Sequence, residues 1–247
     1  MPLDLKPSRI KLKAARDHIE RLKNCTSPLD PKFYDISLIE TREPVIMLNA
    51  PKCYLLVYKP KEPVPETLAN MIGDVVGNLK SALDYAAVRI DVPGTYFPTA
   101  PRANLPQLAS LVKLEAKLPG FRDLLLDRLR PENGPDEPLW ALIGKANNEN
   151  KHEDFIPTVT MVRVQGINAR YANTTLNNCA IVGDAAKPIN MIKSFAPIHF
   201  SSRYETIVDL KFGPGTSAPN EAVVPILQRA SDAVQCTLDE VDKMANS

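Results

Sequence analysis

The chain has almost no net charge, little histidine and no long apolar run, and each shortage excludes a class of protein. Its 30 basic residues are balanced by 29 acidic ones, so no overall field attracts nucleic acid, an anionic membrane or an acidic substrate. No window approaches the roughly 18 apolar residues of a spanning helix, and residues 1–13 carry charges where a signal peptide needs an apolar core. We therefore expect a soluble, cytoplasmic protein without membrane contact.

Cysteine and histidine are sparse and scattered, which argues against a disulfide framework and a metal site. The four cysteines stand far apart without a CxxC pair, as in a reduced protein that has no disulfide. The three histidines form no HxxxH or HExxH motif, so we predict no metal ion. Glycine-rich nucleotide-binding loops are also missing, and we expect no cofactor.

What the chain does contain is 44% hydrophobic residues, arranged in helical and alternating patterns. The strongest helical pattern covers residues 66–90. Weaker ones cover 8–24, 104–118, 119–130, 138–156 and 225–244. Ser8 is a suitable N-cap for the first helix, whose basic outer face would either meet phosphate or lie in solvent. Alternating runs at 33–40 and 52–59 predict a small antiparallel meander, and further β-type runs follow from residue 158.

These patterns predict a single α+β domain over residues 1–247. Residues 1–156 would form a mainly helical, bundle-like part with an inserted small β-meander near 33–59. Residues 157–247 would form a β-rich part, in which an antiparallel sheet is closed by a C-terminal helix. The 23 prolines mark many of the element boundaries.

The polar stretch ANNENKHEDF, residues 146–155, is the first candidate for a functional site because it directly follows an apolar helical run. Asn150 takes the next core-facing position after three apolar residues, whereas His152 points to nearly the opposite side. Asn150 would then satisfy backbone groups at the ends of neighbouring elements. In the functional alternative, His152 is a general acid or base and Lys151 holds an anion, with Asn147 in the same helical row as Lys151.

A second candidate is the polar face of the helix predicted over residues 66–90. Its members are Asp74, Asn78, Ser81 and Tyr85, with Lys80 and Asp84 beside them. Two glycines in the same helix, Gly73 and Gly77, indicate the close approach of another backbone. We expect this polar seam to pack against the helix near 138–156, where it would form a shared site or a subunit contact.

Three segments resemble, in order and spacing, a widespread family of uncharacterised bacterial and phage proteins. They are PETLANMIGDVVGNLKSALDYAA, YFPTA and LWALIGKANNENKHEDF. Members of that family tend to read GD followed by NLRSALDH, then FPI, then DKHR at these places. The likeness is good over residues 60–157 and loose elsewhere, and it implies no established activity.

The family's arginine and histidine form an RxxxxH pattern that resembles the motif of HEPN ribonucleases, helical proteins of toxin–antitoxin and antiphage systems. There the arginine would steady the scissile phosphate while the histidine moves a proton. This chain has Lys80 and Tyr85 at those positions, and a phenol is a poor general base near neutral pH. It keeps Lys151 and His152 of the second motif, with Asn150 where the family has aspartate.

The sequence therefore predicts a non-enzymatic binding or interaction protein, with a second copy or another protein as its partner. The alternative is a HEPN-like RNA-binding protein or degenerate ribonuclease. Its catalytic candidates would be Lys80, Tyr85 and His152, with Lys151 also at the phosphate and Asn150 orienting the substrate. RNA has no support from the net charge, and no residue constellation establishes catalysis. The alternative requires the lysines and His152 to converge on one exposed cleft.

Overall fold

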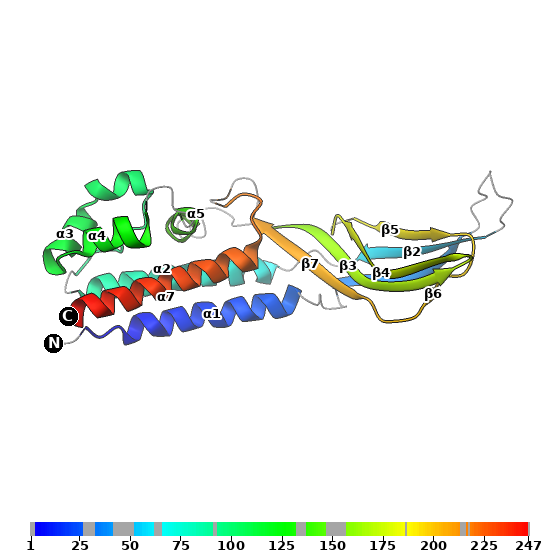
Figure 1. The fold of residues 1–247 in the computed structure, drawn as a ribbon, viewed down its shortest axis with the longest axis horizontal. Coiled ribbons are helices and arrows are strands. Elements are labelled where there is room, and N and C mark those ends of the chain that lie inside the picture. The colour runs from blue at the N-terminus through cyan, green and yellow to red at the C-terminus, as the bar shows by residue number, and fades with distance from the viewer. Residues whose placement is uncertain are drawn as a thin grey trace. The chain divides into compact units, whose positions relative to one another are not determined.

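The computed structural model describes residues 3–26, 33–41, 52–61, 66–90, 93–131, 137–146, 157–185, 187–212, 216 and 218–246. The chain separates into two compact units, each assembled from segments far apart in the sequence (Figure 1). Unit 1 comprises Met1–Leu22, Thr67–Pro157 and Phe212–Ser247, and unit 2 comprises Lys23–Glu66 and Thr158–Lys211. Helices dominate unit 1 and strands dominate unit 2, which confirms the mixed α and β class.

Three long helices dominate unit 1: α1 (Lys6–Thr26), α2 (Glu66–Arg89) and α7 (Val223–Asn246). Each helix carries a stripe of apolar residues at spacings of three and four, and these stripes are buried. They include Leu12, Ala15, Ile19 and Leu22 on α1, Ile72, Val75, Leu79 and Leu83 on α2, and Leu227, Ala230, Val234, Leu238 and Val241 on α7. The sequence pattern predicted all three helices to within two residues at each end.

The cap of α1 differs from the prediction. Asp4 Oδ1 accepts a hydrogen bond from the backbone N–H of Lys6 at 3.0 Å, so this carboxylate supports the first turn. Ser8 lies inside the helix and is fully buried, and its hydroxyl has no hydrogen-bond partner among the described residues. The assignment of Ser8 as N-cap was wrong because Asp4, an equally good capping residue, precedes it.

A regular ladder of polar contacts joins α1 to α7. Arg9 donates to Asp239 at 2.9 Å and to Asp242 at 3.3 Å. Arg16, two turns later on α1, donates at 3.2 Å to Asp232, which lies two turns earlier on α7. The residue numbers change in opposite directions, so the two helices are antiparallel. Two cations of the basic face of α1 are thus paired with acids of α7 rather than free to meet phosphate.

The remaining helices within the described residues of unit 1 are short. They are η2 (Arg102–Gln107), α3 (Ala109–Lys117), α4 (Phe121–Asp123) continued by η3 (Leu124–Leu129), and α5 (Glu137–Ala141) continued by η4 (Leu142–Ala146). η2 and α3 divide the predicted helix 104–118 in two. In α5 and η4, Trp140, Leu142 and Ile143 are buried, which confirms that the run before the polar stretch enters a core.

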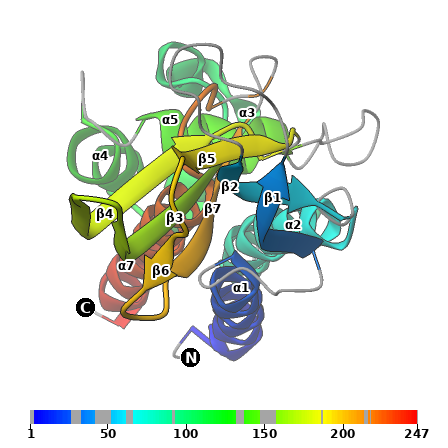
Figure 2. The same ribbon diagram turned by 90° about the vertical axis from the view of Figure 1, so that its right-hand side faces the viewer.

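The described residues of unit 2 form two sheets (Figure 2), and buried residues of both sheets belong to one hydrophobic cluster. The first sheet has the order β1 (Tyr34–Thr41), β2 (Cys53–Pro60), β5 (Ile189–Ser194). The second sheet has the order β4 (Thr174–Gly183), β3 (Pro157–Tyr171), β6 (His199–Phe200). In the second sheet β7 (Glu205–Phe212) also pairs with β3. Pairs β1–β2, β2–β5, β3–β4 and β3–β6 are antiparallel. Leu56 and Ile192 of the first sheet meet Val164 and Ile167 of the second in the core.

The strands β1 and β2 pack in a different part of the structure from the one predicted. The meander near 33–59 was expected inside the helical part, yet β2 pairs with β5, with Tyr54 opposite Ser194. Alternation along a strand predicts which face is buried but not which distant strand will be its neighbour. The run VIMLN at 45–49, which was predicted as part of the meander between β1 and β2, lies outside the described residues. Since α7 belongs to unit 1, the closure of the sheet by this helix stays a prediction.

Two bulges lie side by side on β3 and β4, where the register between the strands shifts twice. Gly166 on β3 has φ 72° and Asn178 on β4 has φ 48°. Asn168 links them, because its Oδ1 accepts the backbone N–H of Asn178 at 2.7 Å and its Nδ2 donates to the Gly166 carbonyl at 3.2 Å. The same Nδ2 donates to Ser202 Oγ at 2.8 Å. One side chain therefore ties both bulges to the chain after β6.

Candidate functional site

A surface depression in unit 1 is lined by all three segments that carry the family resemblance. Its volume is about 450 Å³. The lining residues are Lys80 and Asp84 of α2, the segment Tyr96–Ala100, Leu108 and Ser110 at the start of α3, and Gly144 of η4. The predicted polar seam and the helix that precedes ANNENKHEDF thus border the same hollow.

Phe97 is fixed beside this depression through both its backbone and its ring. Asp84 Oδ1 accepts the backbone N–H of Phe97 at 2.9 Å, and Lys80 Nζ donates to its carbonyl oxygen at 3.4 Å. The Phe97 ring stacks on Trp140 with centroids 6.1 Å apart and meets Phe121 edge-on at 5.7 Å. We name Lys80, Asp84 and Phe97 the Phe97 clamp. The clamp anchors the segment after α2 to α2 itself.

Within the clamp, the charge of Lys80 is already neutralised. Its ammonium lies 2.5 Å from Asp84 Oδ1, one turn later on α2, and the two side chains are only 13% and 24% exposed. Two of its three N–H donors therefore have protein acceptors. Lys80 presents no free cation to a phosphate.

Gly144 brings η4 into close contact with the segment Tyr96–Ala100. A Cβ at this position would lie 2.9 Å from the carbonyl oxygen of Thr99 and 2.9 Å from its Oγ1, too close for any side chain without a shift of the Thr99 backbone. Thr99 thus contacts η4, and the Phe97 ring contacts Trp140 of α5. These two contacts connect α5 and η4 to the segment Tyr96–Ala100, which the clamp ties to α2.

Tyr96 stands at the mouth of the depression. Its side chain is 70% exposed, the largest value among the big hydrophobic residues described. Lys80 Nζ lies 5.7 Å from the centroid of its ring, within the range of a cation–π contact. Tyr96 belongs to the motif YFPTA but was not among the predicted site residues. The sequence signal that could have indicated its exposure is its position next to Phe97, because Phe97 is the buried one of these two neighbouring aromatic residues.

The other candidates on α2 do not join the depression. Asn78 and Ser81 donate hydrogen bonds of 2.8 and 2.7 Å to carbonyl oxygens one turn earlier in the same helix, a local pattern common for such residues. Asp74 is exposed, and Tyr85 is 44% exposed and absent from the lining. Of the predicted polar seam, the clamp residues alone reach the neighbouring segment.

The residues of the second motif, Asn147, Asn150, Lys151 and His152, lie outside the described residues. Their convergence with Lys80, and the core-facing position of Asn150, stay predictions.

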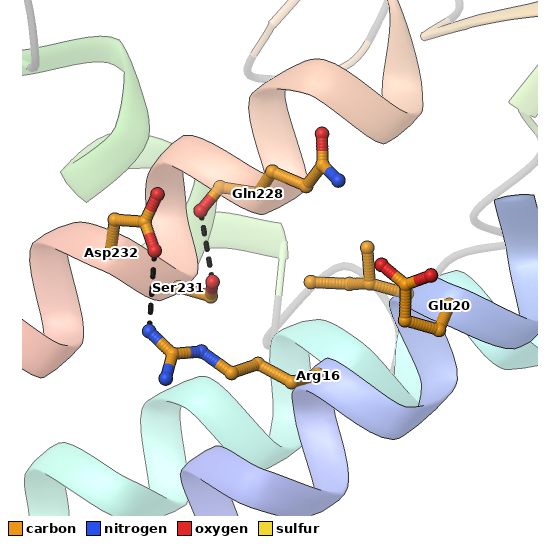
Figure 3. A pocket seen from close by; sticks show the side chains of 6 residues that line it. Arg16, Glu20, Gln228, Ser231 and Asp232 are labelled. Atoms are coloured by element: carbon orange, nitrogen blue, oxygen red, sulfur yellow. Dashed lines mark hydrogen bonds and ion pairs between the residues drawn. The ribbon is translucent and has the colours of Figure 1, made fainter.

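A second depression of about 400 Å³ lies between α1 and α7 (Figure 3). It is lined by Arg16, Ile19, Glu20, Gln228, Ser231 and Asp232. The Arg16 guanidinium donates to Asp232 and, at 3.4 Å, to Gln235 Oε1. Ser231 Oγ donates to the Gln228 carbonyl at 2.9 Å within α7. These hydrogen bonds join α1 to α7 or lie within α7, and Arg16, the one cation among the described lining residues, is paired with Asp232. We therefore assign the second depression a structural role.

Hydrogen bonds that hold helices of unit 1 in place lower the pKa values of Asp239 and Glu115. Burial alone would raise the pKa of Asp239, but hydrogen bonds from Gln235 and Arg9 outweigh it and lower the pKa. The backbone N–H groups of Arg122 and Gly120, 2.7 and 3.0 Å from the Glu115 carboxylate, lower the pKa of Glu115. Glu115 thereby caps the N-terminal end of α4.

Among the described residues, no group of three or more His, Cys, Asp and Glu side chains is placed to hold a metal ion. The helices of that part of the chain include none that is both long and apolar enough to cross a bilayer. All four cysteines, Cys25, Cys53, Cys179 and Cys236, are free thiols.

Comparison of the chain with protein-family models, with curated proteins and with solved structures gives no match. The functional argument therefore depends on the geometry of the depression beside Tyr96, and the family resemblance stays a prediction.

Proposed function

We propose that the protein is a non-enzymatic binding protein that receives a ligand or a protein partner at the depression beside Tyr96. One observation carries this proposal: the charge of Lys80 is neutralised by Asp84, while the Tyr96 ring above it is exposed. Catalysis on a phosphate depends on a cation aimed at the developing charge. Recognition depends instead on an accessible aromatic side chain held in place, which is what this site offers.

The support of Tyr96 is rigid, which favours binding. The next residue, Phe97, is held by two backbone hydrogen bonds and two aromatic neighbours, and Thr99 abuts Gly144. A contact residue that is already ordered loses little entropy when a ligand arrives. The hydroxyl-bearing residues Thr99 and Ser110 also line the hollow, so an aromatic surface and hydrogen-bonding groups lie together, as in many small-molecule sites.

The resemblance to the bacterial and phage family is part of the same proposal. Residues from its three motif segments line one depression, which gives a common physical reason for the motifs to occur together. In this interpretation the lysine or arginine of the first motif is a structural partner of the aspartate that follows it, and the motif builds a binding site.

The alternative, an RNA-binding protein or degenerate ribonuclease, requires Lys80 to leave Asp84 and the Phe97 carbonyl before it can contact a phosphate. Lys80 and Tyr85 also project about 140° apart around α2, by the 100° advance per residue of a helix. Neither feature favours a shared phosphate site, so we place this function second.

The experiment is a nuclear magnetic resonance titration of the ¹⁵N-labelled protein with phenol, indole, inorganic phosphate and a single-stranded RNA oligonucleotide at low salt. We expect the aromatic probes to shift the backbone amide signals of Tyr96, Phe97, Thr99, Ala100 and Ser110. A Tyr96→Ala variant should lose these shifts, whereas Val88→Ala, at an exposed position of α2, should keep them. RNA binding or cleavage that Lys80→Gln abolishes would instead support the ribonuclease alternative, and no response to any probe would contradict both.

A further inference from the structure

β4 is an edge strand without the usual protection. Among the described residues it pairs with β3 alone (Figure 2). It is 10 residues long, reads TTLNNCAIVG, and contains no charged residue and no proline. Proteins guard exposed edges with charges, prolines or short strands, because an open row of backbone donors and acceptors recruits another strand. The edge strands of the other sheet follow this rule, with Asp35 and Glu40 on β1 and Lys193 on β5.

The bulge at Asn178 interrupts β4, and no residue of the following segment, Cys179–Gly183, has a positive φ; the other register shift of this ladder adds its extra residue on β3, between Val164 and Ile167. The side chains of Cys179–Gly183 alternate between two environments. Cys179 and Ile181 pack against the core of unit 2, while Ala180 and Val182 are exposed, Val182 at 47%. An uncharged, apolar strand segment of this kind is prone to pair with another strand when it is left open.

We propose that Cys179–Gly183 pairs antiparallel with the same segment of a second copy of the chain. A twofold axis at Ile181 places Ala180 of each copy opposite Val182 of the other, so the larger exposed side chain always meets the smaller one. No like charges meet, and Asp184 just beyond the segment falls opposite Asn178 of the partner. The two copies of the sheet become one continuous sheet.

The exposed residues of Cys179–Gly183 form a self-complementary pattern, and a second copy of the chain is therefore the partner that fits this edge. In an isologous contact the same patch must serve both partners, and a neutral segment whose exposed residues alternate small and large meets that condition. The contact lies in unit 2, whereas the depression beside Tyr96 lies in unit 1. The inference therefore goes beyond the proposed binding function and does not depend on it.

The test compares the full-length wild type with two oppositely charged double variants by sedimentation velocity over a wide range of concentrations. The variants are Ala180→Lys/Val182→Lys and Ala180→Glu/Val182→Glu. The wild type should form a dimer. Each variant alone should raise the dimer Kd by about tenfold or more, because like charges then face each other across the axis. An equimolar mixture of the two should recover the dimer, since opposite charges then pair.

Controls keep the test decisive. Leu38→Lys places the same charge at an exposed position of β1 and should leave the dimer Kd unchanged, and melting curves should show that all variants fold. A wild type that stays monomeric overturns the proposal, as does a dimer that both charged variants retain or a mixture that fails to recombine. In the wild type, amide hydrogen exchange of Cys179–Gly183 should slow as concentration rises. Unchanged rates in a forming dimer would place the contact elsewhere and overturn the proposal.

Discussion

Asp84 Oδ1 accepts hydrogen bonds from both the ammonium of Lys80 and the backbone N–H of Phe97. One carboxylate oxygen thus neutralises a partly buried charge and fixes the segment that follows α2. This double use makes Asp84 the residue of the depression whose replacement has the clearest consequences.

Asp84→Asn should lower the free energy of unfolding by about 1–3 kcal/mol. The asparagine keeps an acceptor for Phe97 but leaves Lys80, 13% exposed, without its counter-charge. Urea denaturation measures the loss. Adding Lys80→Met to this variant should recover part of it, because the uncompensated charge is removed. If the double variant lost as much as the sum of the two single changes, the two residues would not be coupled.

Gly144→Ala should destabilise unit 1, because the new Cβ would approach the Thr99 backbone carbonyl to 2.9 Å. We expect a loss of about 1–3 kcal/mol, the usual range for overpacking. The emission of Trp140, the one tryptophan of the chain, reports the unfolding directly because its ring is buried in the same unit. Asn70→Ala, at an exposed position of α2, is the control and should change stability by less than about 0.5 kcal/mol. Equal stability of Gly144→Ala and the wild type would show that η4 can move away.

Glu115→Gln should destabilise the protein only above the pH at which Glu115 ionises. The folded-state pKa of Glu115 is lowered from 4.5 by the N–H groups of Arg122 and Gly120, so its contribution is fully present above the unfolded pKa. That contribution is lost as the pH falls through the folded pKa. We expect a difference of about 0.5–1 kcal/mol at neutral pH, since the group is partly exposed. Melting curves from neutral to acid pH measure it, and a difference that persists unchanged in acid would contradict the capping role.

Asn168→Ala should destabilise unit 2 by about 1–3 kcal/mol, because the backbone N–H of Asn178 loses its acceptor and Ser202 loses its donor. Asn168→Asp keeps the acceptor and should lose less. Denaturation followed by far-ultraviolet circular dichroism measures both variants. Asn177→Ala, an exposed neighbour on β4, serves as the control. A similar effect of Asn177→Ala and Asn168→Ala would mean that the bulges do not depend on the Asn168 bridge.

The helices and the existence of most strands could be predicted because they depend on local periodicity. The stripe of α7, for example, needs only residues three and four apart, and the residues at this spacing within the predicted range 225–244 are buried. The pairing of β2 with β5 could not be predicted, since Tyr54 and Ser194 are opposite each other without any local signal that links them. For the same reason the sequence assigned β1 and β2 to the helical part.

The candidate site was predicted in part. Lys80 and Asp84 were predicted to lie beside the polar face of α2, because a helical wheel depends on the sequence alone. Their common target, the backbone of Phe97, is set by the path of the chain after α2, which the turn residues do not specify. The exposure of Tyr96 likewise depends on Phe97 occupying the place beside Trp140, a contact between segments more than forty residues apart.

The ladder between α1 and α7 also sets an order of events during synthesis. Arg9 and its partner Asp239 are 230 residues apart, and the strands of unit 2 are encoded between them. At about 5–20 residues per second, α1 waits for roughly ten to forty seconds before α7 leaves the ribosome. Throughout that interval the surface of α1 that α7 will cover is open to chaperones, and by its end the strands β1 to β7 have all been synthesised.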